Sequence, residues 1–262
     1  MKTNVELELA EGVAWLVFSA AEPVKPASVD YELLDLLELH LKKLSAAAAA
    51  DVEAVRVLVL ASASPKYFVV GANLEALKSV DQHSIAAWIE RGHEVYNRLA
   101  DLPFPVIAKV TGYALGGGLE LAMACDWILA ADSARFGQPE AGLGFVAGWG
   151  GCLRLPAIIG SAAARELFST GRIIEAAEAY RLGLVNFAGS PADLERRLAE
   201  TIEQIKKNSA TAVSQMKRIM NAEQNRMREF SRYAETASSI ACLAAGDTAR
   251  RLEDFFAKRA GK

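Results

Sequence analysis

The sequence has few of the residues that mark a secreted, metal-binding or membrane-spanning protein. Its three cysteines are Cys125, Cys152 and Cys242. They form no CxxC pair, so we expect buried, inert thiols rather than a disulfide framework or a metal site. The first residues lack the apolar stretch of a secretory signal. The most apolar stretch, 113–131, is interrupted by Glu120 and Asp126, which argues against a membrane span. We therefore expect a cytoplasmic protein.

An excess of charge of either sign is also missing. The 262 residues include 29 Lys and Arg against 32 Asp and Glu, for a net charge of −3. This balance gives no overall attraction for nucleic acid or an anionic membrane, and we expect neither as a partner. Hydrophobic residues make up 52% of the chain, at the upper edge of ordinary composition. Disorder is thereby excluded, and either a large core or a subunit interface is expected.

Several common catalytic motifs are absent. The sequence contains no GxxxxGK[ST], GxSxG or HExxH, and the glycines at 142, 144 and 148 do not have GxGxxG spacing. The histidines His40, His83 and His93 have no evident nucleophile to pair with, so we expect structural roles for all three.

The hydrophobic pattern predicts an α/β protein with mainly parallel strands. Segments 5–9 and 13–18 read as a hairpin. The predicted strands and helices that follow alternate along the chain: helix 31–44, strand 55–60, helix 85–99, strand 106–110, helix 118–125 and strand 127–131. From about residue 192, helical patterns run almost to the end. We therefore divide the chain into a core, 1–191, and a helical C-terminal region, 192–262.

The C-terminal region carries a methionine stripe and several basic residues. Met216, Met220 and Met227 fall on one helical face, which is typical of core or of a subunit contact. The basic residues read either as a nucleic-acid patch or as solvated helix faces. Glutamates lie among them and the whole chain is slightly acidic, so we favour solvated faces.

A glycine-rich turn is the most distinctive local feature. A predicted strand leads into Gly116, Gly117 and Gly118, and a helix begins at once. The free N–H groups of a helix start, at its positive dipole end, suit a developing oxyanion. A tight strand–helix packing corner is the alternative. Glu120, one turn into the helix, is either an acid–base group or a cap for those N–H groups.

Two further segments extend this candidate site. Pro139 ends a strand, which places Glu140 in a loop, twenty residues after Glu120 and with one strand between them. Two carboxylates beside an oxyanion hole would suit acid–base chemistry next to a carbonyl. Gly71 and Ala72 follow another strand and offer a bare backbone as a second donor.

These motifs together resemble the enoyl-CoA hydratase/isomerase (crotonase) family. The resemblance rests on GYALGGGLELA (112–122), FGQPE (136–140), TGR (170–172), Ala179 with GLVN (183–186), and FFAKR (255–259). It implies a spiral of ββα units followed by a helical C-terminal region for trimerisation. It further implies a homotrimer or dimer of trimers and a CoA thioester as substrate, with no separate cofactor and no metal.

The resemblance also assigns residues to roles. The N–H groups of Ala72 and Gly117 match the oxyanion-hole donors, and Glu120 and Glu140 match the acid–base glutamates. The positions matched to substrate binding are Gly71, Gly116, Gly148, Lys66 and Lys258. Lys258 is either a phosphate contact or a solvated lysine.

The sequence also departs from the family pattern. Asn73 stands where Asp is usual, Val69 and Val70 replace smaller residues, and the segment 23–29 is only loosely similar. Trp149 stands where a small residue is common, which predicts an unusual acyl pocket.

We expect an enoyl-CoA hydratase that adds water to a 2-enoyl-CoA thioester, because both glutamates are present. The alternatives are a Δ3,Δ2-enoyl-CoA isomerase, another reaction of the family such as acyl-CoA decarboxylation or hydrolysis, and a non-catalytic RNA-binding or scaffold protein on the same fold.

Overall fold

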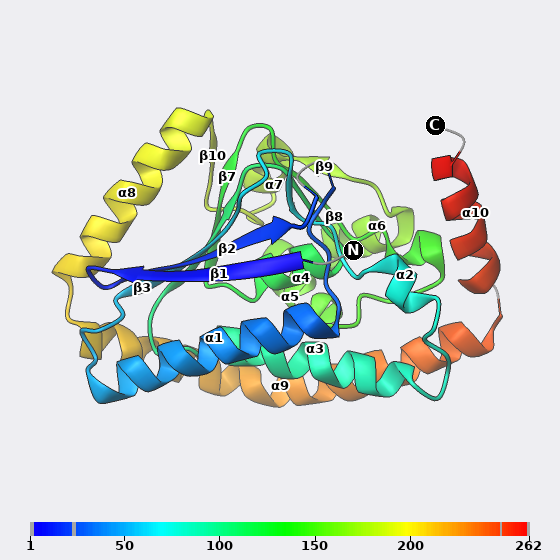
Figure 1. Cartoon of the computed structure of the whole chain (residues 1–262), viewed down its shortest axis with the longest axis horizontal. Coiled ribbons are helices and arrows are strands. Elements are labelled where there is room, and N and C mark those ends of the chain that lie inside the picture. Colours follow the sequence, from blue (N-terminus) through cyan, green and yellow to red (C-terminus); the bar gives the residue numbers. More distant parts are fainter. Residues whose placement is uncertain (1–2, 23–24, 247, 261–262) are drawn as a thin grey trace.

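The computed structural model describes residues 3–22, 25–246 and 248–260, which form two β-sheets with helices packed around them (Figure 1). In this part of the chain the larger sheet has six strands, in the order β1 (Thr3–Ala10), β2 (Val13–Ala20), β3 (Val57–Ser62), β5 (Val106–Val110), β7 (Trp127–Ala131) and β10 (Phe187–Gly189). The smaller sheet has the order β4 (Tyr67–Val69), β6 (Tyr113–Leu115), β8 (Arg135–Gly137) and β9 (Ile174–Glu175). The helices are α1 (Tyr31–Ala50), α2 (Leu74–Leu77), α3 (Ile85–Ala100), α4 (Gly117–Met123), the 3₁₀ helix η1 (Glu140–Leu143), α5 (Gly151–Ile159), α6 (Ser161–Thr170), α7 (Ala176–Arg181), α8 (Pro191–Lys207), α9 (Ala210–Ala244) and α10 (Thr248–Ala260).

The larger sheet begins with the predicted hairpin and continues in parallel. A two-residue turn joins β1 to β2, and both of its residues, Glu11 and Gly12, have positive φ, 51° and 79°. Such a turn matches the twist of the flanking strands. The pairs β2–β3, β3–β5, β5–β7 and β7–β10 are all parallel. The expected hairpin and the mainly parallel pairing are thus confirmed.

The two faces of the larger sheet are covered by different helices. Strand residues alternate between faces, so Leu58 and Leu60 pack on one side with the leucines of α1 and with α3. Val57 and Val59 point to the other side, where Leu194, Leu198 and Ile202 of α8 cover them. Figure 1 shows α8 on one side of the sheet and α1, α3 and α9 on the other. Two helical layers therefore enclose this sheet.

Strands of the two sheets alternate along the chain and are followed by helices. The strand β3 leads to β4 and then to α2 and α3, β5 leads to β6 and α4, and β7 leads to β8 and η1. Each unit is two strands followed by helical structure, which is the ββα arrangement that the family resemblance implies. Because β4, β6 and β8 are neighbours, the chain leaves them at one edge of the smaller sheet. The glycine-rich turn and the Glu140 segment are brought together at that edge.

Helix α9 is inverted with respect to an ordinary surface helix. Its buried positions are polar: Lys217, Arg228, Ser231, Glu235 and Ser239. Its exposed positions include large apolar side chains: Met216, Ile219, Met220, Met227, Phe230, Tyr233 and Ile240. The methionine stripe is therefore not part of the core of this chain. The alternative, a subunit contact, stays a prediction, and the exposed apolar face of α9 supports it.

The predicted burial of the thiols is correct for one cysteine in three. Cys125 is buried, Cys242 is half-buried and Cys152 is exposed, and all three are free. None of the helices in the described part of the chain combines the length and the hydropathy that a bilayer span requires.

The buried polar face of α9 predicts a measurable contribution to stability. The Lys217 Nζ donates to Asp126 Oδ2 at 2.7 Å and to the Phe104 carbonyl at 2.9 Å. We expect Lys217→Met to lower the free energy of unfolding by about 1–3 kcal/mol, because the Phe104 carbonyl loses this donor and the Asp126 carboxylate, although still bonded to the Val106 N–H, loses its counter-ion. Urea unfolding at one protein concentration measures the change. Lys207→Met, at an exposed position of α8, is the matched control, and an equal loss in both variants would contradict the prediction.

Candidate active site

A cavity of about 530 Å³ opens at the edge of the smaller sheet. Its lining comes from the segment 70–77 and from α3, α4, η1, the turn before α5, and α10. The apolar part of the wall includes Leu74, Leu77, Ile85, Trp88, Ile89, Phe145, Trp149 and Phe255. The polar part includes both predicted glutamates, Glu120 and Glu140. An apolar pocket with a few convergent polar groups is the usual form of a small-molecule site.

The two predicted oxyanion donors lie next to each other on this wall. Gly117 is the first residue of α4, so its N–H has no acceptor one turn earlier in the helix. Ala72 forms a parallel bridge with Val29, in which the Gly71 carbonyl and the Asn73 N–H bond to Val29 at 2.8 and 2.7 Å. The Ala72 N–H therefore points to the opposite side, toward α4.

Gly116 makes this approach sterically feasible. Its φ is +54°, which favours glycine, and a Cβ added there would lie 2.7 Å from Glu140 Oε1. Gly71, with φ +87°, faces it: an added Cβ would lie 3.6 Å from the Gly117 nitrogen. The glycines thus bring two backbone segments and one carboxylate together, and the turn is more than a strand–helix packing corner.

The carboxylate of Glu120 is buried and caps a helix other than its own. Glu120 is 2% exposed, and its Oε1 accepts the N–H groups of Trp149 and Gly151, both at 2.7 Å. These residues belong to the start of α5, whose positive dipole end faces the carboxylate. The capping alternative considered for Glu120 therefore holds, but the free N–H groups are those of α5.

Glu140 enters the cavity from the opposite wall. The structure differs from the expected loop, because Glu140 begins the short 3₁₀ helix η1, directly after Pro139. The buried Gln138 amide, with its nitrogen toward the carboxylate, donates to both Glu140 oxygens at 2.9 and 3.0 Å. Gln138 thus fixes the Glu140 carboxylate, and nothing in the sequence singled it out.

Burial and mutual repulsion perturb the ionisation of both glutamates. Removal from water raises the pKa of Glu120 well above its usual value, and the negative charges of Glu140 and then Glu235 raise it further. The two backbone N–H groups act in the opposite direction and lower it. Burial raises the pKa of Glu140 to about 7. Glu140 therefore exchanges its proton near neutral pH, and its negative charge, once formed, opposes the ionisation of Glu120.

Trp149 forms the deep end of the cavity. Its indole packs against Trp88 and Tyr96, with ring centroids 5.0 and 5.5 Å away, and its Nε1 donates to the Trp88 carbonyl at 3.2 Å. A Cβ added at Gly92 of α3 would lie 2.2 Å from the indole. This large side chain is thus built into the core, and it narrows the pocket on the α3 side.

Three of the five predicted substrate-binding residues line the cavity, and two lie outside its lining. Gly71, Gly116 and Gly148 line the cavity, and a Cβ at Gly148 would lie 2.2 Å from Ile89. Lys66 and Lys258 are outside its lining. The Lys66 ammonium lies over the Tyr67 ring, and Lys258 is exposed on α10.

The Asn73 departure has a local explanation. Its side chain accepts the N–H of Glu75 at 3.1 Å and caps α2. Asparagine caps a helix as well as aspartate does, so this substitution leaves the donor segment at Ala72 in place.

The buried pair Glu235 and His93 lies next to the cavity, behind the turn before α5, and sequence reasoning missed it. The His93 Nε2 and Glu235 Oε2 are 2.8 Å apart, and the same oxygen accepts the Gly150 N–H at 2.9 Å. The two residues are 142 positions apart and belong to no shared motif, so no local signal could have found them. His93 keeps the structural role expected for it.

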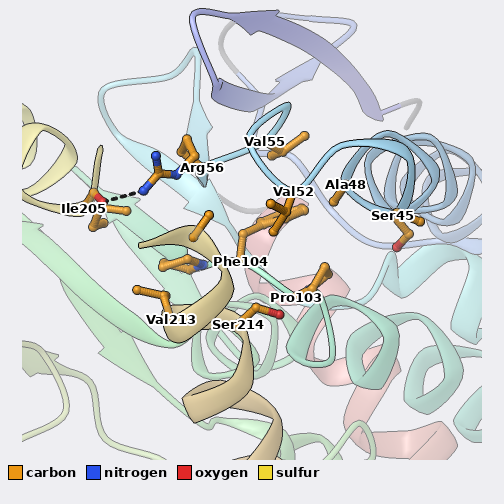
Figure 2. A pocket seen from close by; sticks show the side chains of 13 residues that line it. Ser45, Ala48, Val52, Val55, Arg56, Pro103, Phe104, Ile205, Val213 and Ser214 are labelled. Atoms are coloured by element: carbon orange, nitrogen blue, oxygen red, sulfur yellow. Dashed lines mark hydrogen bonds between the residues drawn. The ribbon is translucent and has the colours of Figure 1, made fainter. Parts of the chain in front are cut away.

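A second, smaller cavity of about 270 Å³ lies between the end of α1 and the start of α9 (Figure 2). Its wall is mostly apolar, and no acidic residue lines it. Arg56, at its edge, donates to the Ile205 carbonyl at 3.0 Å and to the Asn208 carbonyl at 2.5 Å. That guanidinium caps the C-terminal end of α8 and also pairs with Glu53 at 2.6 Å, so its contacts are structural. Among the described residues, no group of three or more His, Cys, Asp or Glu side chains could hold a metal ion.

Comparison with known proteins places this arrangement in a family. The family model for enoyl-CoA hydratase/isomerase matches residues 39–260. A crotonyl-CoA hydratase of Syntrophomonas wolfei is 33% identical over 98% of this chain and 96% of its own length. A short-chain-enoyl-CoA hydratase of Clostridium acetobutylicum is 41% identical over 64% of each chain.

Solved structures of enoyl-CoA hydratases resemble this chain in fold. An enoyl-CoA hydratase from Bacillus anthracis, 31% identical, superimposes with a TM-score of 0.77 over 97% of this chain and 96% of its own. An enoyl-CoA hydratase from Bacillus halodurans, 22% identical, shares the fold with a TM-score of 0.84 over 95% and 99% of the two chains. The chain belongs to the enoyl-CoA hydratase/isomerase family.

Proposed function

We propose that this protein is an enoyl-CoA hydratase that reversibly adds water to a 2-enoyl-CoA thioester. The observation that carries the proposal is the cavity in which Glu120 and Glu140 face the N–H groups of Ala72 and Gly117. Relatives named crotonyl-CoA hydratase and short-chain-enoyl-CoA hydratase support the same reaction. Coenzyme A enters as part of the substrate, and the chemistry requires no further cofactor and no metal.

The thioester carbonyl oxygen lies between the two N–H groups in this proposal. When a nucleophile adds to the β carbon, negative charge moves onto that oxygen and an enolate forms. Donors that are already oriented stabilise this charge without reorganisation, and each one lowers the activation free energy by about 3 kcal/mol. The free N–H at the start of α4 adds the positive end of the helix dipole.

The two glutamates divide the proton transfers. They hold one water molecule between them. Glu120, as carboxylate, takes a proton from this water while its oxygen attacks the β carbon. Glu140, as carboxylic acid, then protonates the α carbon of the enolate. Each product molecule thus gains one hydroxyl group and one proton, and the reverse reaction uses the same groups with their protonation states exchanged.

We also propose that the protein is a cytoplasmic homotrimer or dimer of trimers, assembled through its helical C-terminal region, 192–262. The support is the inverted helix α9, whose exposed face carries large apolar side chains such as Ile219, Met220 and Phe230. A contiguous apolar face of this kind favours a protein partner, and a second copy of the chain fits the closed symmetry of most oligomers.

Removal of either carboxylate is the direct test of the reaction. We expect Glu120→Gln and Glu140→Gln each to lower kcat for hydration by about 10²–10⁴-fold, since each removes one proton-transfer group. The assay follows the loss of absorbance of the conjugated thioester with a panel of enoyl-CoA substrates. Glu8→Gln, on an exposed position of β1, is the control.

Two results would contradict the hydratase proposal. One is near-full hydration by Glu120→Gln. The other is a wild-type enzyme that hydrates none of the panel but consumes a β,γ-enoyl or carboxylated thioester, which indicates the isomerase or decarboxylase reaction.

One carboxyl group that must be protonated and one that must be ionised predict a bell-shaped pH dependence of kcat/KM. Glu140 must be protonated to act as the acid, so kcat/KM falls as the pH rises through its pKa, which is about 7 in the free enzyme. At lower pH, kcat/KM falls again because Glu120 must be ionised to act as the base. A pH profile of kcat/KM checks both limbs, and a profile flat across the neutral range would contradict this assignment.

A charge on the apolar face of α9 should disrupt the assembly. We expect Ile219→Glu to shift the protein toward monomers, because burying an unpaired carboxylate in an interface is unfavourable. Light scattering gives the masses, and the wild-type mass decides between three and six copies. The control Gln204→Glu, exposed on α8, should keep the wild-type mass, and an unchanged mass for Ile219→Glu would show that the face lies outside any interface.

A further inference from the structure

A third carboxylate lies buried behind the candidate site. Glu235, on α9, is 3% exposed. Its Oε2 accepts the Gly150 N–H at 2.9 Å and lies 2.8 Å from His93 Nε2, and its Oε1 accepts the Ser231 hydroxyl at 2.8 Å. Because a carboxylate only accepts hydrogen bonds, the hydrogen-bond pattern assigns the proton to His93 Nε2. Three donors therefore satisfy one buried carboxylate.

Glu235 and Glu120 share one turn of backbone. The N–H groups of Trp149 and Gly151 bond to Glu120, and the N–H of Gly150 between them bonds to Glu235. Gly150 has φ +93°, and in this conformation its N–H points to a carboxylate other than the one its two neighbours bind. The turn before α5 is thus held by a carboxylate from α4 and a carboxylate from α9.

We propose that Glu235 is a positioning residue for the candidate active site, which fixes the Glu120 carboxylate through the shared turn 149–151 and places a second buried negative charge behind it. The proposal rests on the proposed function, because it concerns how Glu120 is prepared for proton transfer. It gives the C-terminal helix α9 a direct connection to the reaction centre.

The charge of Glu235 acts on Glu120 in a defined direction. After burial and the charge of Glu140, the negative charge of Glu235 is the next cause that raises the pKa of Glu120. The opposing positive group is the buried guanidinium of Arg154, which donates to the Trp149 carbonyl at 2.8 Å and to Asn97 Oδ1 at 2.7 Å. Burial lowers the pKa of Arg154 to about 10, so it stays charged at neutral pH.

The remaining titratable groups around the two carboxylates come from three elements. They are Glu90, His93 and Tyr96 on α3, Cys152 on α5, and Arg228 and Arg232 on α9. Arg232 pairs with Glu90. Partial removal from water, and then the charges of Glu235, Glu120 and Glu140, raise the pKa of the otherwise exposed Cys152 thiol to about 12, so the thiol stays neutral near neutral pH.

The variant Glu235→Gln removes the charge and keeps the hydrogen bonds. The amide oxygen can accept from Gly150 and His93 as the carboxylate does, and the amide nitrogen can donate to the Ser231 hydroxyl. We expect the acidic limb of the kcat/KM profile to move to lower pH, because Glu120 ionises more readily without the neighbouring charge. The alkaline limb, which Glu140 sets, should stay in place, because burial and not the charge of Glu235 raises that pKa. The value of kcat/KM at the optimum should stay within about tenfold of wild type. This loss is much smaller than the one expected for a missing proton-transfer group.

Two further variants separate positioning from charge. Glu235→Asp keeps the charge but is too short to reach Gly150 and His93 together, so we expect limbs at the wild-type pH and a lower kcat with little change in KM. Glu229→Gln, exposed on the same helix, is the matched control and should leave the profile unchanged. An unmoved acidic limb in a folded Glu235→Gln, or an unchanged kcat in Glu235→Asp, would overturn the proposal. The Glu235→Asp result decides the positioning role if Glu235→Gln does not fold.

A spectroscopic measurement distinguishes a failure of this proposal from a failure of the proposed function. The infrared band of the protonated Glu120 carboxyl group, identified by its absence in Glu120→Gln, can be titrated in the enzyme without substrate. We expect that band to disappear at lower pH in Glu235→Gln than in wild type. If wild type hydrates no enoyl-CoA, the reaction assignment fails, while this titration still supports or overturns the effect of Glu235.

Discussion

A carboxylate in the protein interior has to be held by donors that replace water, and the Glu120 carboxylate is held by the N–H groups of Trp149 and Gly151. This contact joins the helix that follows the glycine-rich turn to the beginning of α5. The contact therefore orients the Glu120 carboxylate, fixes Trp149 in the cavity wall and connects two ββα units. The ionisation of Glu120 depends on it as well, because the two N–H groups lower a pKa that burial raises.

Electrostatics in this region follow from the exclusion of water. Glu120, Glu140 and Glu235 converge with one buried cation, Arg154, among them. Their mutual repulsion is offset by backbone N–H groups, by the Gln138 amide and by His93. Such a cluster is costly for folding, and perturbed ionisation of this kind gathers at functional sites. The polar inner face of α9 contributes one of the three carboxylates, so the C-terminal region belongs to the site as well as to the proposed assembly.

Much of the fold and of the site could be predicted from the sequence because both depend on local patterns. The alternating residues of the hairpin and the buried strands such as β5 and β7 have clear periodicity, and the structure has these elements. The smaller sheet was not predicted, since strands of two or three residues such as β6 and β8 have no period to detect. The start of η1 at Glu140 and the exposure of Cys152 also escaped prediction, because packing decides them.

The high apolar content, the glycine turn at 116–118 and two glutamates twenty residues apart can all be read from the residues alone. Folding brings these glutamates to one cavity, turns the Ala72 N–H toward α4 and places Glu235 behind Glu120. It also leaves the apolar side chains of α9 facing outward while its polar ones face the core. The physical reason is that hydrogen-bond geometry and burial depend on long-range packing, which residue spacing along the chain does not encode.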